Sequence, residues 1–223
     1  MPDALDSSEF LARHDLPDWR ILLRGIEAWF EAPTFAAAAA FAAEVATAAD
    51  AADHHPDIDL RYPGRVHVRL TSHDAGGLTD RDAALAATIS AGAAARALGS
   101  DPLRAARLEV AIDVLDVEAV RPFWTAVLGY EDDPPEDDGV VWAIHDPTGI
   151  GPAVWFQQMD APRPQRNRIH LDVTVPHDEV DARVAATLAA RGTVASDAAA
   201  RAFWVLADPE GNEACLCTWE DRD

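Results

Sequence analysis

Residues 50–82 read DAADHHPDIDLRYPGRVHVRLTSHDAGGLTDRD, and this stretch decides how the first half of the chain folds. The alanine-rich segment before it favours a helix, with Thr34 as its N-cap. Pro56 disfavours helical geometry in the residue before it, so this helix is expected to end near His54 or His55.

The rest of the stretch predicts a β-hairpin followed by a second helix. Alternating apolar residues mark strands at 58–62 and 65–71, and Pro63-Gly64 between them suits a tight turn. Residues 79–82 form a capping box, a side-chain pattern that begins helices, and we expect this helix to reach about Leu98.

The chain is expected to form two domains. A strand region at 19–30 completes the elements of the first half, and residues 99–102, Gly-Ser-Asp-Pro, break the pattern. Beyond them the strand-like segment 109–116 is echoed about sixty residues later by 170–177, and each is followed by a helical stretch and further strands. The predicted domain ranges are 1–100 and 105–223.

Three histidines of the first half are candidates for proton transfer. His54 and His55 are adjacent near the end of the first helix, and His73 follows the second hairpin strand. Asp50 precedes His54 by four residues, so within a helix its carboxylate can accept a ring N–H and select the tautomer. Imidazole titrates at about pH 6.5, which lets histidine give and take protons at neutral pH.

Simpler interpretations of these residues stay open. A histidine near a helix end can interact with the helix dipole, and Asp82 can act only as a capping carboxylate. The adjacent pair His54-His55 lacks the i,i+4 spacing that places two metal ligands on one helical face, so no metal is expected here.

Charge and composition argue against several classes of partner. The 223 residues carry a formal charge of −21, which disfavours nucleic acids and anionic membranes. No membrane span is expected, because even the apolar run 35–52 is interrupted by polar residues. Residues 1–6 lack the features of a secretion signal, so a cytoplasmic protein is predicted. Cys215 and Cys217 lie two apart on one strand face, which is unsuited to a disulfide between them.

The first hundred residues resemble pterin-4a-carbinolamine dehydratases. The motifs that carry the resemblance are Asp50-x-x-Asp53-His54-His55-Pro56, Thr71-Ser-His-Asp-x-Gly-Gly-Leu-Thr79 and Arg81-Asp82. The resemblance implies a hydro-lyase, a 4a-hydroxytetrahydrobiopterin dehydratase, that needs neither metal nor organic cofactor. It also implies a pterin substrate, an aromatic amino acid hydroxylase as a partner, and a homo-oligomer.

The resemblance also assigns residues to the site. It makes His54, His55 and His73 the catalytic group, with Asp50 as the supporting carboxylate where the family usually has Glu. Three further carboxylates are implied in orientation or pterin contacts: Asp53, Asp74 and Asp82.

The second half resembles the vicinal-oxygen-chelate, or glyoxalase-like, superfamily. The resemblance rests on Phe123-Trp124, Leu128-Gly129-Tyr130, Arg168-Ile169-His170-Leu171-Asp172 and Asp208-Pro209-Glu210-Gly211-Asn212-Glu213. Metal-dependent members take ligands from equivalent strands of both repeats, which here implies Glu109 and His170. At the later ligand positions stand Cys215 and, in the first repeat, Ala153 or Val154, with Glu213 one pleat from Cys215. A binding cup without metal is therefore expected.

The sequence thus predicts an α+β protein with two domains. One is an antiparallel sheet with helices, and the other is a paired βαβββ domain. Two other functions stay open, a non-catalytic binding or dimerisation module and a metal-dependent lyase or dioxygenase in the second domain.

Overall fold

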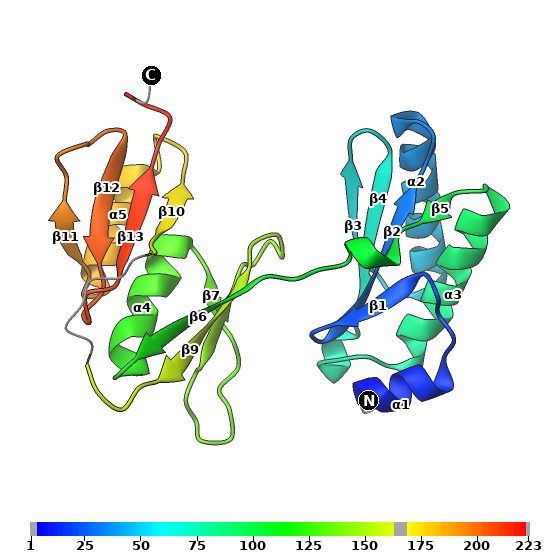
Figure 1. The fold of residues 1–223 in the computed structure, drawn as a ribbon, viewed down its shortest axis with the longest axis horizontal. Helices are drawn as coiled ribbons and strands as arrows, with labels where there is room; N and C mark the ends of the chain where they lie inside the picture. Colours follow the sequence, from blue (N-terminus) through cyan, green and yellow to red (C-terminus); the bar gives the residue numbers. More distant parts are fainter. Residues whose placement is uncertain (1–3, 163–168, 222–223) are drawn as a thin grey trace. The chain divides into compact units, whose positions relative to one another are not determined.

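The computed structural model describes residues 4–162 and 169–221, so Arg168 of the second-half motif lies outside the described residues. The chain forms two compact units, Met1–Arg107 and Leu108–Asp223, each with its own hydrophobic core (Figure 1). The mixed α+β class is confirmed in both units.

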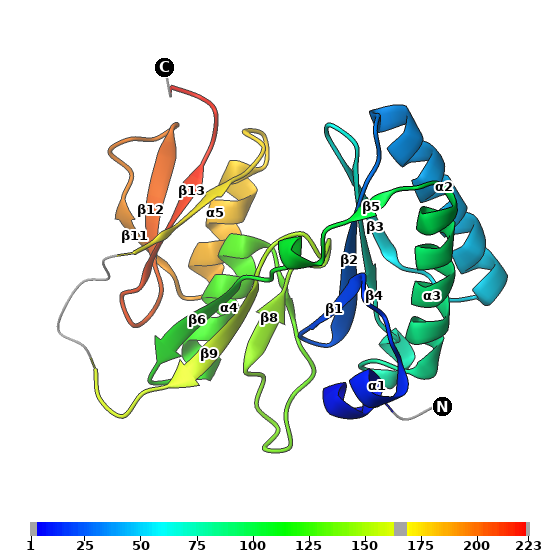
Figure 2. The same ribbon diagram turned by 45° about the vertical axis from the view of Figure 1, so that its right-hand side comes forward.

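The first unit is an antiparallel sheet with two long helices on one face (Figures 1 and 2). The sheet order is β1-β2-β4-β3, and β5 pairs with β2. The elements are α1 (Ser7–Arg13), β1 (Trp19–Leu22), β2 (Gly25–Glu31), α2 (Phe35–Ala52), β3 (Asp57–Arg61), β4 (Arg65–Leu70), η1 (His73–Ala75), α3 (Asp80–Ala95), β5 (Gly99–Ser100) and η2 (Pro102–Arg104).

The predicted helix starts are confirmed. The Thr34 side chain accepts a hydrogen bond at the start of α2, and Thr79 forms a capping box with Asp82 at the start of α3. The expected strand region at 19–30 is two strands, β1 and β2, and α1 was not predicted. Helix α3 ends at Ala95 rather than Leu98, because the chain tightens into a turn and Ala97 adopts a positive φ of 54°.

The core of the first unit lies between the sheet and the helices α2 and α3. Alternate residues of the central strands point into it, since successive side chains of a strand face opposite sides. They meet Phe41 and Val45 of α2 and Leu85 and Ile89 of α3. The buried strand residues are Ile26, Ala28, Phe30, Val66, Val68 and Leu70.

Helix α2 departs from the expectation that no segment could span a membrane. Among the described helices, α2 is the one that is long and apolar enough to cross a membrane, judged by length and composition alone. Core helices meet the same criterion, and α2 packs one face, which includes Phe41 and Val45, into the core of the first unit.

The other face of this sheet carries a buried ionic cluster. His67 lies between Glu27, 3.0 Å from its Nε2, and Asp59, 3.1 Å from its Nδ1, and its ring stacks on Trp29. Arg107 donates a hydrogen bond to Glu27. Burial by itself would raise the pKa of Glu27, but hydrogen bonds from His67 and Arg107 outweigh it and hold this pKa below its usual value.

This cluster explains where the first unit ends. The backbone N–H of Asp101 donates to the Trp29 carbonyl, and Arg107 bonds to Glu27. The segment after the predicted break at 99–102 is thereby held on the first sheet, so the contacts divide the chain after Arg107.

The second unit contains two βαβββ repeats. The first comprises β6 (Glu109–Val114), α4 (Val117–Leu128), β7 (Glu131–Asp132), β8 (Ala143–His145) and β9 (Ala153–Gln158). The second comprises β10 (Leu171–Thr174), α5 (Val180–Ala189), β11 (Thr193–Ser196), β12 (Phe203–Ala207) and β13 (Glu213–Cys217). Each forms a four-stranded sheet, β6-β9-β8-β7 or β10-β13-β12-β11, and α4 packs against α5.

The repeat predicted from the sequence is therefore confirmed strand by strand. In each copy the first strand pairs in parallel with the last, β6 with β9 and β10 with β13. Cys215 and Cys217 both lie on β13, and they are not joined by a disulfide.

Candidate active site

His54 lies just beyond the end of α2 and is buried, with 7% of its surface exposed. Asp53 takes a left-handed conformation (φ 47°, ψ 42°) and ends the helix, so His54 leaves the helical path. Its Nε2 is 2.8 Å from Oδ1 of Asp82. The expectation that Asp50 stacks on His54 is therefore wrong, because the helix ends before the i,i+4 pair is complete.

Asp82 is fully buried and connects His54 to the start of α3. Its Oδ2 accepts hydrogen bonds from the Ser72 hydroxyl at 2.8 Å and from the Thr79 backbone N–H at 2.7 Å. Both donors are fixed, since Ser72 and Thr79 also bond to each other through their hydroxyls at 2.8 Å. Asp82 thus holds the His54 ring as well as capping the helix, two roles that the sequence offered as alternatives.

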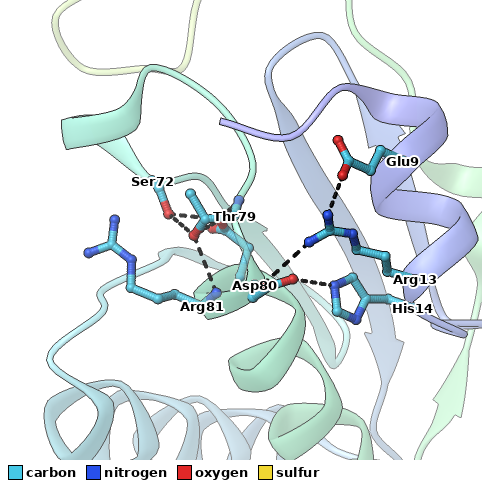
Figure 3. A network of polar contacts seen from close by, with 8 residues as sticks. Glu9, Arg13, His14, Ser72, Thr79, Asp80 and Arg81 are labelled. Carbon is cyan, nitrogen blue, oxygen red and sulfur yellow. Dashed lines mark hydrogen bonds and ion pairs between the residues drawn. The ribbon is translucent and has the colours of Figure 1, made fainter. Parts of the chain in front are cut away.

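Contacts with α1 hold the same helix start in place (Figure 3). Asp80, the first residue of α3, lies 2.9 Å from Nε2 of His14 and 3.8 Å from Arg13. Figure 3 also shows the backbone nitrogen of Arg81 at the Thr79 hydroxyl, 3.2 Å away. These contacts tie α1 to the first turn of α3, and none of them involves the Asp82 carboxylate.

Asp50 is the partner of His55. Its Oδ1 lies 3.0 Å from His55 Nε2, and both side chains are largely exposed, 80% for Asp50 and 60% for His55. The adjacent histidines therefore each pair with a carboxylate, His54 with the buried Asp82 and His55 with the exposed Asp50.

His73 and Asp74 lie in η1, between β4 and α3, and both are exposed. The Asp74 carboxylate pairs with Arg81, and this hydrogen bond lowers the pKa of Asp74. His73 has no side-chain partner among the described residues.

A pocket of about 200 Å³ lies between α2 and α3 beside His54. Its lining is Ala48, Ala52, His54, Arg81, Ala84, Leu85 and Thr88. Three alanines leave the space open, and His54 and Arg81 are its two ionisable groups. The volume is below the about 300–1,000 Å³ usual for drug-sized ligands, so it suits part of a flat small molecule.

The predicted site residues thus fall into two groups. His54 lines this pocket, with Asp82 bonded to it and Asp74 paired with the lining residue Arg81, whereas His55 and His73 do not line it. The contribution of Arg81 was missed, although it stands beside Asp82 in the motif. The backbone of Asp53 ends α2, and a pterin contact by its side chain stays a prediction.

The ligand positions of the second unit do not match the set implied by the resemblance. The register pairs Glu109 with Ala153 and Ala111 with Trp155, so Trp155 corresponds to Cys215 in the other repeat, rather than Ala153 or Val154. An oxygen-rich site shared by both repeats therefore lacks a ligand on β9.

The second repeat does gather three donors that the sequence reasoning had not grouped. One ligand atom from each of His170, Asp172 and Cys215 lies within 4.8 Å of the others. Burial and the neighbouring Asp172 carboxylate raise the pKa of the Cys215 thiol to about 11. The signal for Asp172 was its place two residues after His170, on the same strand face.

The architecture and the buried His–Asp pair define a two-domain α+β protein with a candidate acid–base site in its first unit. A family model described as pterin 4 alpha carbinolamine dehydratase matches residues 3–91, and one described as glyoxalase-like domain matches residues 109–217.

Relatives match the first unit closely. A protein of Chloroflexus aurantiacus named "Putative pterin-4-alpha-carbinolamine dehydratase" is 55% identical over 73 residues, 33% of this chain and 77% of the relative. One of the same name from Acidobacterium capsulatum is 53% identical over 76 residues, 34% of this chain and 82% of the relative. The chain belongs to the pterin-4-alpha-carbinolamine dehydratase family through its first unit, and its second unit matches the glyoxalase-like domain model.

Solved structures resemble each half. A transcriptional coactivator/pterin dehydratase from Brucella melitensis is 30% identical, with 41% of this chain and 99% of that chain covered and a TM-score of 0.37. A glyoxalase/bleomycin resistance protein/dioxygenase family enzyme from Burkholderia phytofirmans is 19% identical, with 49% and 95% covered and a TM-score of 0.40.

Proposed function

We propose that the first unit dehydrates 4a-hydroxytetrahydropterin to quinonoid dihydropterin by histidine acid–base catalysis, without metal or organic cofactor. The observation that carries this proposal is the buried His54–Asp82 pair beside the pocket between α2 and α3. Membership of the dehydratase family supports the choice of substrate.

The reaction needs one proton donor and one acceptor. The C4a–O bond breaks and its electrons leave with the oxygen, which takes a proton and departs as water. The electrons of the neighbouring ring N–H bond form the new C=N bond as a base removes that proton. A positioned acid and base each act at this step, and such catalysis contributes about 10²–10⁴-fold to a rate.

His54 is the proposed base. Asp82 carries no proton when ionised, so it accepts the Nε2–H of a neutral His54 ring. Nδ1 then carries the free lone pair and can remove a proton. Because the remaining lone pairs of Asp82 are used by Ser72 and Thr79, this tautomer is the one that the buried network satisfies.

His55 is the proposed acid. Asp50 accepts a hydrogen bond from its Nε2 at 3.0 Å, which leaves Nδ1 of a doubly protonated ring free to give its proton. The exposed position of the pair lets the ring regain a proton from water after each turnover. His73, on the neighbouring η1, is proposed to complete the catalytic group, and Asp74 and Arg81 to contact the polar edge of the pterin.

The direct test is the rate at which the purified chain converts 4a-hydroxytetrahydropterin to quinonoid dihydropterin. We expect acceleration over the uncatalysed reaction, and a loss of about 10²–10⁴-fold in His54→Ala. His145→Ala, which changes a half-buried histidine of the second unit, is the matched control and is expected to keep full activity. Absence of both acceleration and pterin binding would refute the proposal.

A pocket-filling variant tests the location of the site. Ala84→Leu adds bulk at the lining of the pocket on α3, so it is expected to raise KM with little change in the stability of the unit. If this variant binds and converts the pterin as the unchanged chain does, the substrate lies elsewhere.

The biological setting is proposed from the family. An aromatic amino acid hydroxylase that makes the 4a-hydroxypterin would supply the substrate, in the cytoplasm, to a homo-oligomer of this chain. Sedimentation measures the oligomer. A role as a binding or dimerisation module alone predicts that His73→Ala leaves the cellular phenotype intact, whereas the enzymatic proposal predicts its loss.

A further inference from the structure

The second unit contains a cluster of three different metal-binding side chains. His170 and Asp172 are exposed and Cys215 is buried, and one donor atom of each lies within 4.8 Å of the others. His170 Nε2 lies 3.2 Å from Asp172 Oδ1. The trio supplies one nitrogen, one oxygen and one sulfur donor.

The backbone fixes how these side chains meet. Asp172 on β10 is the register partner of Cys215 on β13, and adjacent parallel strands bring such side chains to the same face. The neighbours of Cys215 along the strand, Ala214 and Leu216, point into the core of the unit. Cys215, Asp172 and His170 therefore share the face that is turned away from that core.

The same positions of the first repeat show that the cluster does not follow from the fold alone. Glu109, Ala111 and Trp155 stand where the second repeat has His170, Asp172 and Cys215. Trp155 offers no ligand and is 39% exposed, so the first repeat presents an aromatic surface at this place. The donor set is a property of the second repeat.

The donor chemistry selects the ion. Magnesium and calcium take six or more oxygen ligands, which one carboxylate does not supply. Zinc takes four ligands in tetrahedral geometry, accepts sulfur, nitrogen and oxygen together, and often keeps one position open where three protein ligands bind it.

We propose that His170, Asp172 and Cys215 bind one Zn²⁺ ion within the second repeat, with a fourth coordination position open. The Cys215 thiol releases its proton to solvent as the zinc–sulfur bond forms, and the imidazole binds through an unprotonated nitrogen. This arrangement differs from the ligand set implied by the superfamily, in which Glu109 joins His170 from the other repeat. It is also independent of the reaction proposed for the first unit.

The test uses the full chain, stripped with a chelator and then dialysed against Zn²⁺ or Co²⁺. We expect one zinc per chain, and with cobalt a near-ultraviolet absorption band from sulfur-to-cobalt charge transfer. Cys215→Ser is expected to remove the band and to weaken binding by more than the about 10–100-fold that follows loss of a residue supporting a ligand.

Four further variants keep the test decisive. His170→Ala and Asp172→Asn alter exposed residues, so the unit is expected to remain folded while zinc binding falls. Cys217→Ser, the neighbouring cysteine on the same strand, and Glu109→Gln are controls expected to retain both stoichiometry and band. Substoichiometric zinc in the unchanged chain, a cobalt complex without the sulfur band, or loss of binding in Glu109→Gln would each overturn the proposal.

Discussion

Replacing Asp82 by Asn tests the proposed role of the buried network more sharply than removing a histidine. Oδ2 of Asp82 accepts from the Ser72 hydroxyl and from the backbone N–H of Thr79, and this N–H cannot become an acceptor. The amide oxygen of the substituted side chain must therefore take that place, and its NH₂ group must face Nε2 of His54. His54 then has to accept at Nε2 and carry its proton at Nδ1, the atom proposed to act as the base.

The size of the effect follows from these contacts. The amide still fills the volume and still accepts from Ser72 and Thr79, so we expect a loss of only about 1–3 kcal/mol in stability, the range for weakened hydrogen bonds to a charged group. Turnover is expected to fall by about 10²–10⁴-fold, because the ring is held in the wrong tautomer. A comparable loss of activity follows from the equivalent substitution in serine proteases.

Three measurements separate chemistry from folding. Urea unfolding gives the stability, the dehydration assay gives kcat, and ¹⁵N chemical shifts of the His54 ring report which nitrogen carries the proton. Asp80→Asn, two residues earlier and 67% exposed, is the matched control and is expected to keep both tautomer and turnover. A folded Asp82→Asn chain with the tautomer switched and kcat unchanged would refute the assignment of His54 as the base.

Three other changes test the site and the fold. Asp50→Ala removes an exposed partner of His55. Because exposed ion pairs contribute about 0.2–1 kcal/mol, turnover should fall by less than about tenfold and should recover in Asp50→Glu. A hundredfold loss of turnover in Asp50→Ala would contradict this view. Glu27 has a pKa lowered by its cationic partners, so its ionised form stabilises the fold at neutral pH and that contribution is lost as the pH falls through the lowered value. Glu27→Gln should therefore be less stable to urea than the unchanged chain at pH 7, and this difference in stability should narrow in acid. A difference in stability that stays the same at every pH would argue against the pairing of Glu27 with its cationic partners. Gly64→Ala places a Cβ 2.6 Å from a backbone oxygen and should lower the free energy of unfolding by about 1–3 kcal/mol. Gly99→Ala is the control, because a Cβ at Gly99 meets open space. Equal midpoints of urea unfolding for the two variants would be inconsistent with the packing at Gly64.

Local features of the sequence predicted much of this fold. Thr34 and Thr79 begin helices because their hydroxyls satisfy backbone N–H groups within three residues, and such short-range bonds can be read from sequence. The turn at Pro63-Gly64 and the alternation of the flanking strands were readable for the same reason. The repeat of the second half was visible because both copies keep the same order of elements.

Which carboxylate pairs with which histidine was harder to predict from the sequence. Spacing alone joined Asp50 to His54, but the left-handed conformation of Asp53 ends the helix and leaves Asp50 paired with His55. The true partner of His54 is Asp82, 28 residues away, where it also resembles an ordinary capping residue.

The sequence by itself determined the two-unit α+β organisation, the helix starts, the hairpin and the family motifs, because these depend on contacts between near neighbours or on recurring patterns. Only the tertiary structure decided which carboxylate holds which histidine, and that Asp172 meets Cys215 across β10 and β13. The physical reason is that these pairs form when separate elements pack together or align in register. The number of residues between two positions in the sequence does not determine how close their side chains lie after such packing.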